Sequence, residues 1–107
     1  MLTFELIRDM ERGEREEKTL QKLPGNFMEE VREYITKKQG IQEKSSQDIE
    51  ELATVKRSLK MLFEAREPKI LEQAIYTVKT GLPVENLTKD EERIYLYIIE
   101  ELKKHRE

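Results

Sequence analysis

The sequence predicts an all-α fold, a helical bundle of about four helices whose third helix is long. Apolar residues recur at spacings of three and four in several separate segments, the pattern of one buried helical face. Capping residues and glycine or proline stops separate these segments, and no segment alternates polar and apolar residues as a β-strand does. A chain of 107 residues fits one domain, so we expect residues 1–107 to form a single helical domain.

The first predicted helix covers residues 2 to about 18. Thr3 is a suitable N-cap, and the helix begins with one apolar patch, made by Phe4, Leu6, Ile7 and Met10. Residues 11–19 include no apolar side chain. We therefore expect the second half of this helix to project into solvent, to lie under another chain or to fray.

The second predicted helix covers residues 26 to about 38. Pro24 disfavours helical backbone at Leu23, so the segment before this helix is expected to be extended. Four large apolar residues then share one helical face, namely Phe27, Val31, Tyr34 and Ile35. Gly40 follows as a natural C-terminal stop.

The third predicted helix begins after a cap at Ser45 or Ser46. A rhythm of three and four continues to Val78, on both sides of Pro68. A proline within a helix removes one hydrogen bond and crowds the carbonyl four residues back. We therefore predict one helix of roughly 33 residues with a kink near residues 64–68, the alternative being two helices that meet at Pro68. Gly81 and the proline after it end the helix.

The last predicted helix begins at Thr88, and Glu91 stands at the spacing of a capping box. Its expected buried stripe consists of Ile94, Tyr95, Ile98, Ile99 and Leu102. Basic residues fill its last turn, where the helix dipole favours cations.

Composition gives no argument for a nucleic-acid or membrane partner. The chain carries 20 basic and 23 acidic side chains and a net charge of -3, so no strong field of one sign attracts DNA, RNA or anionic lipid. It has no cysteine, which excludes disulfides and thiolate zinc sites. No apolar run has the length of a signal peptide or of a membrane-spanning helix. We expect a cytoplasmic protein.

The residues of a catalytic, cofactor or metal site are missing from the sequence. The single histidine, His105, lies close to the C-terminus, where a packed and oriented imidazole is rarely supplied. No phosphate-binding glycine loop or metal-ligand motif is present. Acidic clusters, at residues 16–17, 29–33 and 90–92, are interpreted as solvated helix surface, with a paired-carboxylate or magnesium site as the alternative. We therefore expect no enzymatic activity and no cofactor.

Arg66 falls in register with Leu59 and Leu62 on or beside the core face of the long helix. A buried arginine has to be paired, because an unpaired buried charge is costly. The sequence leaves two alternatives open, a salt bridge within the chain and a contact across a subunit interface.

Three groups of residues match segments of a known family. They are residues 20–24 leading into 27–34, residues 66–71 in the long helix and residues 87–95 at the last helix. The closest marks are Leu-Pro-x-x-Phe, ending at Phe27, and Arg-x-x-Lys-Ile, starting at Arg66. In these segments the chain resembles the helical domain of an archaeal GINS subunit, in the branch that places the helical domain first.

The resemblance implies a non-catalytic scaffold of DNA replication. GINS complexes are tetramers of related subunits that support the replicative MCM helicase beside a RecJ-like protein. Carried over to this chain, the second helix would be set by Leu23, Phe27 and Val31, the long helix marked by Arg66, Lys69 and Ile70, and the last helix packed by Ile94, Tyr95 and Ile98. The family adds a small β-rich domain, whereas this sequence ends at Glu107, so the chain is either part of a longer protein or a distant relative. Pro68 departs from the helix-friendly residue expected there.

Long amphipathic helices with a polar extension suit a surface that another chain covers. We therefore expect the chain to associate with other GINS-type subunits or with itself, as a dimer or higher oligomer. The predicted interface residues are Leu2, Phe4, Ile7, Met10, Leu23, Phe27, Arg66, Lys69 and Tyr95; for the first four, ordinary core packing is the alternative. The second functional interpretation is a stand-alone, self-associating helical adaptor unrelated to replication.

Overall fold

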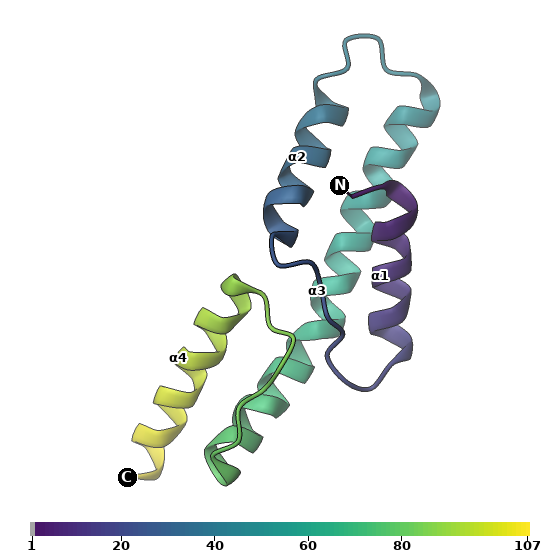
Figure 1. The fold of residues 1–107 in the computed structure, drawn as a ribbon. Helices are drawn as coiled ribbons and strands as arrows, with labels where there is room; N and C mark the ends of the chain where they lie inside the picture. The colour runs from purple at the N-terminus through teal and green to yellow at the C-terminus, as the bar shows by residue number, and fades with distance from the viewer. Residues whose placement is uncertain (1) are drawn as a thin grey trace.

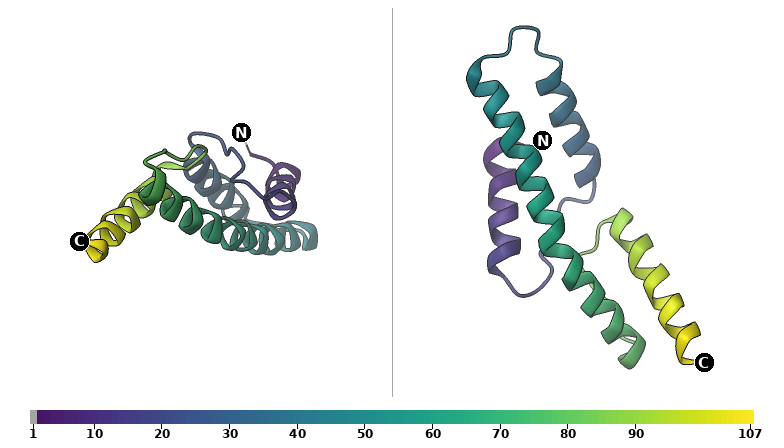
Figure 2. Two further views of the ribbon diagram at one scale, coloured as in Figure 1. Left: turned by 90° about the horizontal axis from the view of Figure 1, so that it is seen from below. Right: turned by 180° about the vertical axis from the view of Figure 1, so that it is seen from behind.

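Residues 2–107 are described by a computed structural model, and they form four α-helices and no strand (Figure 1). The helices are α1 (Phe4–Glu16), α2 (Phe27–Gln39), α3 (Ser46–Thr80) and α4 (Lys89–Arg106). The predicted all-α class, the count of about four helices and the long third helix are confirmed. The molecule is elongated, with extents of 58 × 25 × 20 Å, because α3 alone runs along most of its length (Figures 1 and 2).

Side-chain caps explain where three of the helices begin. The Thr3 hydroxyl accepts a hydrogen bond from the Leu6 amide at 3.2 Å at the start of α1. Ser45 with Asp48, and Thr88 with Glu91, form complete capping boxes at the starts of α3 and α4. Each box satisfies amide groups that the first helical turn leaves without a partner.

The end of α3 depends on a glycine. Gly81 has a φ of 78°, in the left-handed region that glycine adopts without a steric penalty. Its amide donates to the Thr77 carbonyl at 2.7 Å. This turn reverses the chain, so that the segment after Gly81 passes back along α3. The chain then turns again, and α4 runs beside the C-terminal half of α3 in the same direction (Figure 1).

Pro68 lies inside α3 and does not divide it. The helix is continuous from Ser46 to Thr80, so the alternative of two helices meeting at Pro68 is wrong. Pro68 is exposed, which leaves its ring on the solvent side, where the lost backbone hydrogen bond of Glu64 is least costly because water can replace it.

The helices form two packing units that share α3. The first, called the bundle below, consists of α1, α2 and the N-terminal half of α3; its core is made by Leu2, Ile7, Leu23, Phe27, Val31, Val55, Leu59 and Leu62. The second, called the arm, consists of the C-terminal half of α3 and α4; its core is made by Leu20, Ile70, Ala74, Tyr95 and Ile99. Figure 2 shows the arm extending away from α1 and α2.

Several residues of the apolar rhythm are not buried. Ile94, predicted in the buried stripe of α4, is 55% exposed, and this prediction is wrong. Ile49, Leu71 and Ile75 on α3 are also exposed. The reason is that α4 packs against α3 and no other helix of the described chain. A helix with one neighbour buries a narrower face than a helix in a closed bundle.

Candidate functional site

Arg66 lies in the middle of α3, where the bundle meets the arm, and its side chain is fully buried. Its Nε and Nη2 groups donate to the two carboxylate oxygens of Glu91, at 2.7 Å each. Its Nη1 group donates to Glu14 Oε1 at 2.6 Å and to the Gln21 carbonyl at 2.7 Å. Nη2 also donates to the Asn86 carbonyl at 2.8 Å. These bonds use all five N–H donors of the guanidinium.

The partners of Arg66 come from both packing units. Glu14 belongs to α1 and Gln21 to the segment before α2, whereas Asn86 precedes α4 and Glu91 lies in its first turn. Planar, two-pronged pairing with a carboxylate is the geometry that only arginine provides. Arg66 therefore pairs within the chain, one of the two alternatives that the sequence left open, and it joins the arm to the bundle.

Lys69 completes this junction about one turn further along α3. Its Nζ group donates to Glu14 Oε2 at 2.6 Å and to the backbone carbonyls of Glu14, Glu17 and Thr19 at 2.6, 2.8 and 3.1 Å. These carbonyls lie at or just after the C-terminal end of α1, where helical carbonyls lack intrahelical partners and a cation is favoured. Lys69 thus caps α1 from α3.

The charges of the junction stabilise one another. Burial raises the pKa of the Glu91 carboxyl, but hydrogen bonds from Arg66 and Thr88 outweigh burial, and the pKa lies below its ordinary value. Burial lowers the pKa of Arg66, but the carboxylates of Glu91 and Glu14 outweigh it and raise that pKa. Both partners therefore stay ionised at neutral pH.

Two of the three alternatives for residues 11–19 are wrong, because the second half of α1 neither projects into solvent nor frays; that it also lies under another chain stays a prediction. Glu11 and Glu14 are buried, Glu14 completely, and α1 packs along α3. The cause is ionic: Glu14 also accepts from the Gln21 amide at 3.3 Å, in addition to its bonds with Arg66 and Lys69. A search for apolar periodicity alone does not detect a helix face buried through charge pairing.

The junction has a mechanical role in the fold. All donors of Arg66 are used within the chain, and the carboxylates that surround it are occupied. Among residues 2–107, no group of three or more acidic or histidine side chains is placed to hold a metal ion. The hydrogen bonds of Arg66 to both units fix the direction of the arm relative to the bundle.

The predicted interface residues lie mostly under the chain's own helices. The core of the bundle contains Leu2, Ile7, Leu23 and Phe27, with Phe4 and Met10 partly buried against it. The arm core contains Tyr95, and the junction contains Arg66 and Lys69. Their contact with another chain stays a prediction, and a partner would first meet other side chains, which the sequence pattern did not single out.

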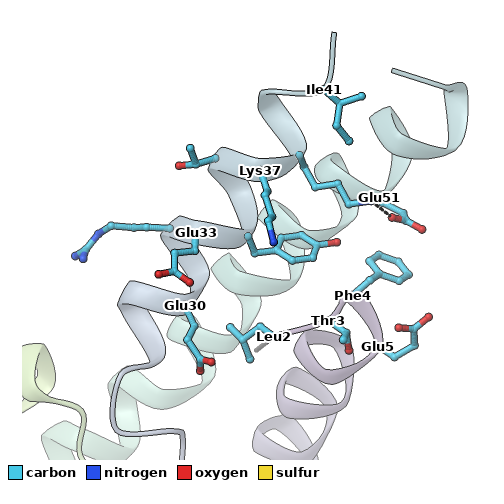
Figure 3. Close-up of a pocket in the computed structure, with 13 residues that line it drawn as sticks. Leu2, Thr3, Phe4, Glu5, Glu30, Glu33, Lys37, Ile41 and Glu51 are labelled. Atoms are coloured by element: carbon cyan, nitrogen blue, oxygen red, sulfur yellow. Dashed lines mark hydrogen bonds and ion pairs between the residues drawn. The ribbon is translucent and has the colours of Figure 1, made fainter. Parts of the chain in front are cut away.

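One such surface is a groove of about 940 Å³ beside α2 (Figure 3). It exists because α1 and α2 each pack on α3 but not on each other. Leu2 and Phe4 line it from one side, and Ile41 lies at the far end of α2. Carboxylates and ammonium groups surround this apolar floor, among them Glu5, Glu33 and Lys37.

Two polar side chains that line the groove, Lys38 and Tyr34, have raised pKa values. Lys38 Nζ contacts Glu51 Oε2 at 2.8 Å and Asp48 Oδ1 at 3.4 Å, and the hydrogen bond to Glu51 is the main reason that the pKa of Lys38 is raised. The Tyr34 hydroxyl is buried without a hydrogen-bond partner in the described chain, and burial raises its pKa.

The arm also exposes large apolar side chains. Large apolar side chains exposed there are Leu71, Ile75, Tyr76, Leu82, Ile94, Leu96 and Tyr97. They point in several directions around α3 and α4, because a two-helix layer cannot cover both of its own faces.

Comparisons of the chain with protein-family models, with curated proteins and with solved structures found no match. Within residues 2–107, no helix combines the length and apolar character needed to span a bilayer.

Proposed function

We propose that this chain is a non-catalytic interaction domain of an archaeal GINS-like DNA replication complex, which acts in the cytoplasm in support of the replicative MCM helicase. Its partners are other GINS-type subunits or further copies of itself, together with the helicase and a RecJ-like protein. In this role the domain holds other proteins in a fixed arrangement and carries out no chemical step.

The pairing of two apolar surfaces with one ionic junction is the observation that carries this proposal. The groove beside α2 and the outer faces of the arm both expose apolar side chains. The junction around Arg66 fixes their relative orientation, since it hydrogen-bonds both units. Two apolar contact surfaces at a set angle are what a scaffold between two partners needs.

The residues of the resemblance also support the proposal. Arg66 and Lys69, the polar marks of the Arg-x-x-Lys-Ile segment, form the junction, and Ile70 of the same segment lies in the arm core. Leu23 and Phe27, from the Leu-Pro-x-x-Phe segment, lie in the bundle core. The matched residues therefore serve one architecture, as they would in a shared fold.

The alternative function is a stand-alone helical adaptor that associates with itself. The exposed apolar residues of α4 favour it, since they form a surface on this chain that requires no replication partner.

Binding between purified proteins tests the proposal. The chain is mixed with the MCM helicase, the RecJ-like protein and any GINS-type subunit of the same organism, and complexes are measured by size exclusion with light scattering. Unwinding of a forked DNA by the helicase is measured with and without the chain. We expect a stable complex with at least one of these proteins and faster unwinding.

A matched pair of variants assigns that binding to the groove. Ile41→Asp places a charge at the groove, whereas Ile49→Asp places it on an isoleucine of α3 that does not line the groove. We expect Ile41→Asp to weaken the complex and Ile49→Asp to leave it intact. If none of the replication proteins binds the unaltered chain, the replication role is refuted; self-association without such binding would support the adaptor.

A further inference from the structure

One face of α4 is open along the whole helix. Asp90, Ile94, Tyr97, Glu101 and Lys104 follow one another at spacings of four, three, four and three, so they share a face. All five are exposed, Ile94 by 55% and Tyr97 by 64%. Because α4 packs only against α3 in the described chain, no other helix covers this face.

The charges along α4 are arranged so that the helix complements itself. On the open face Asp90 stands near the N-terminal end and Lys104 near the C-terminal end, where Lys104 lies 3.6 Å from Glu101 of its own helix. Glu91 takes no part, since it is buried in the junction with Arg66. Two copies of α4 that run antiparallel bring Asp90 of each copy beside Lys104 of the other. A parallel pair would bring like charges together, which costs free energy. The helix dipoles favour the antiparallel arrangement as well.

The apolar residues of this face lie at the centre of the helix. Tyr97 stands midway between Lys89 and Arg106. A two-fold axis that crosses α4 at this point places Tyr97 beside Tyr97 of the second copy and Asp90 beside Lys104 of the second copy. Closed two-fold contacts of this kind use the same patch on both chains, and a central tyrosine within a charged rim is the usual anatomy of a contact surface.

We propose that the occupant of this face is a second copy of this chain, packed antiparallel along α4 about a two-fold axis near Tyr97. The inference rests on the proposed interaction role and specifies one partner and one surface for it. It is tested with the full chain alone, so its failure is separate from any failure to bind replication proteins.

Charge reversal tests the antiparallel register. Asp90→Lys and Lys104→Glu each place like charges at both ends of the pair, and we expect the dissociation constant of each variant dimer to rise by roughly tenfold or more. In an equal mixture of the two variants, each mixed pair restores both attractions, so dimers return. Light scattering across a concentration series measures all three samples, and circular dichroism checks that helix content is unchanged.

Substitutions at the centre test the location. Tyr97→Glu places two carboxylates together at the axis, whereas Leu96→Glu alters a similarly exposed neighbour about 100° around the helix. We expect the first to abolish the dimer and the second to retain it. The chain has no cysteine, so Tyr97→Cys introduces a unique thiol that a short bismaleimide joins into dimers, faster than it joins Leu96→Cys.

Three results would each overturn the proposal. They are an unaltered chain that stays monomeric at the highest concentration, a Tyr97→Glu variant that dimerises as well as Leu96→Glu, and charge variants whose mixture forms no more dimer than either alone.

Discussion

Replacing Arg66 by methionine is the sharpest test of the junction. Methionine fills much of the same volume without charge, so Arg66→Met removes the hydrogen bonds while it preserves packing. The change leaves Glu91, whose side chain is 10% exposed, without the arginine that pairs with it, and it leaves Glu14, whose side chain is fully buried, with Lys69 alone.

The expected loss follows from those two carboxylates. Removing one member of a buried ion pair costs about 3–5 kcal/mol, because the remaining charge is buried and unpaired. Lys69 still contacts Glu14, whereas Glu91 keeps only its cap at Thr88, so the loss falls within this range. Set against a total stability of about 5–15 kcal/mol for a domain, it removes a large part of the free energy of unfolding.

Urea unfolding followed by circular dichroism measures this loss. Arg57→Met is the matched control, an exposed arginine on the same helix, and we expect it to change stability by less than about 0.5 kcal/mol. Adding Glu91→Gln to Arg66→Met should recover part of the stability, since the unpaired charge is removed. A loss below about 1 kcal/mol for Arg66→Met would refute the view that the junction holds the two units together.

Three further predictions concern single residues, each measured by unfolding in urea. Folding lowers the pKa of Glu91 below its ordinary value of 4.5, so the charge of Glu91 stabilises the fold above that pH and this stabilisation is lost as pH falls through the lower folded pKa. The difference in unfolding free energy between the unaltered chain and Glu91→Gln should therefore shrink as pH falls below about 4.5. A difference independent of pH would contradict this. Pro68→Ala should stabilise the chain by roughly 1–3 kcal/mol, since it restores the hydrogen bond to the Glu64 carbonyl, and a destabilised variant would show that the proline is required. Lys69→Met should lower the free energy of unfolding by about 1–3 kcal/mol, because the C-terminal carbonyls of α1 lose their cap. The control Lys60→Met loses only a surface ion pair at 3.9 Å and should lower it by less than about 1 kcal/mol. Equal losses would argue against a capping role.

The sequence predicted the helices well because their ends are coded locally. Thr3, Thr88 with Glu91, and Gly81 each act through side chains or backbone within a few residues, so no knowledge of the tertiary structure is needed to place them. The start of α3 was left between Ser45 and Ser46, and the structure assigns the cap to Ser45.

The junction could be predicted only in part. The register of Arg66 with the core face indicated burial and a need for pairing, but its partners lie 20 to 52 residues away, and periodicity carries no information on such distances. Glu14 was overlooked because an acidic residue on a polar helix is normally solvated. One signal was present: two basic residues, Arg66 and Lys69, lie close together on a mainly buried face, which implies acidic partners elsewhere in the chain.

The sequence also could not predict how wide a face each helix buries. Ile94 belongs to an apolar stripe whether one helix or two pack against it, and only the number of neighbours decides its exposure. In a closed bundle it would be buried, whereas in the arm it is 55% exposed.

The position of Arg66 has a consequence for how the chain loses structure. An extended molecule with two small cores would be expected to melt in two stages, the arm first. Here the guanidinium can be fully satisfied only when α1, α4 and the two loops are all in place. If either core unfolds alone, a buried charged side chain in the other core loses its partner. Unfolding should therefore be cooperative across the molecule, with amide hydrogens of both cores exchanging at the same free energy.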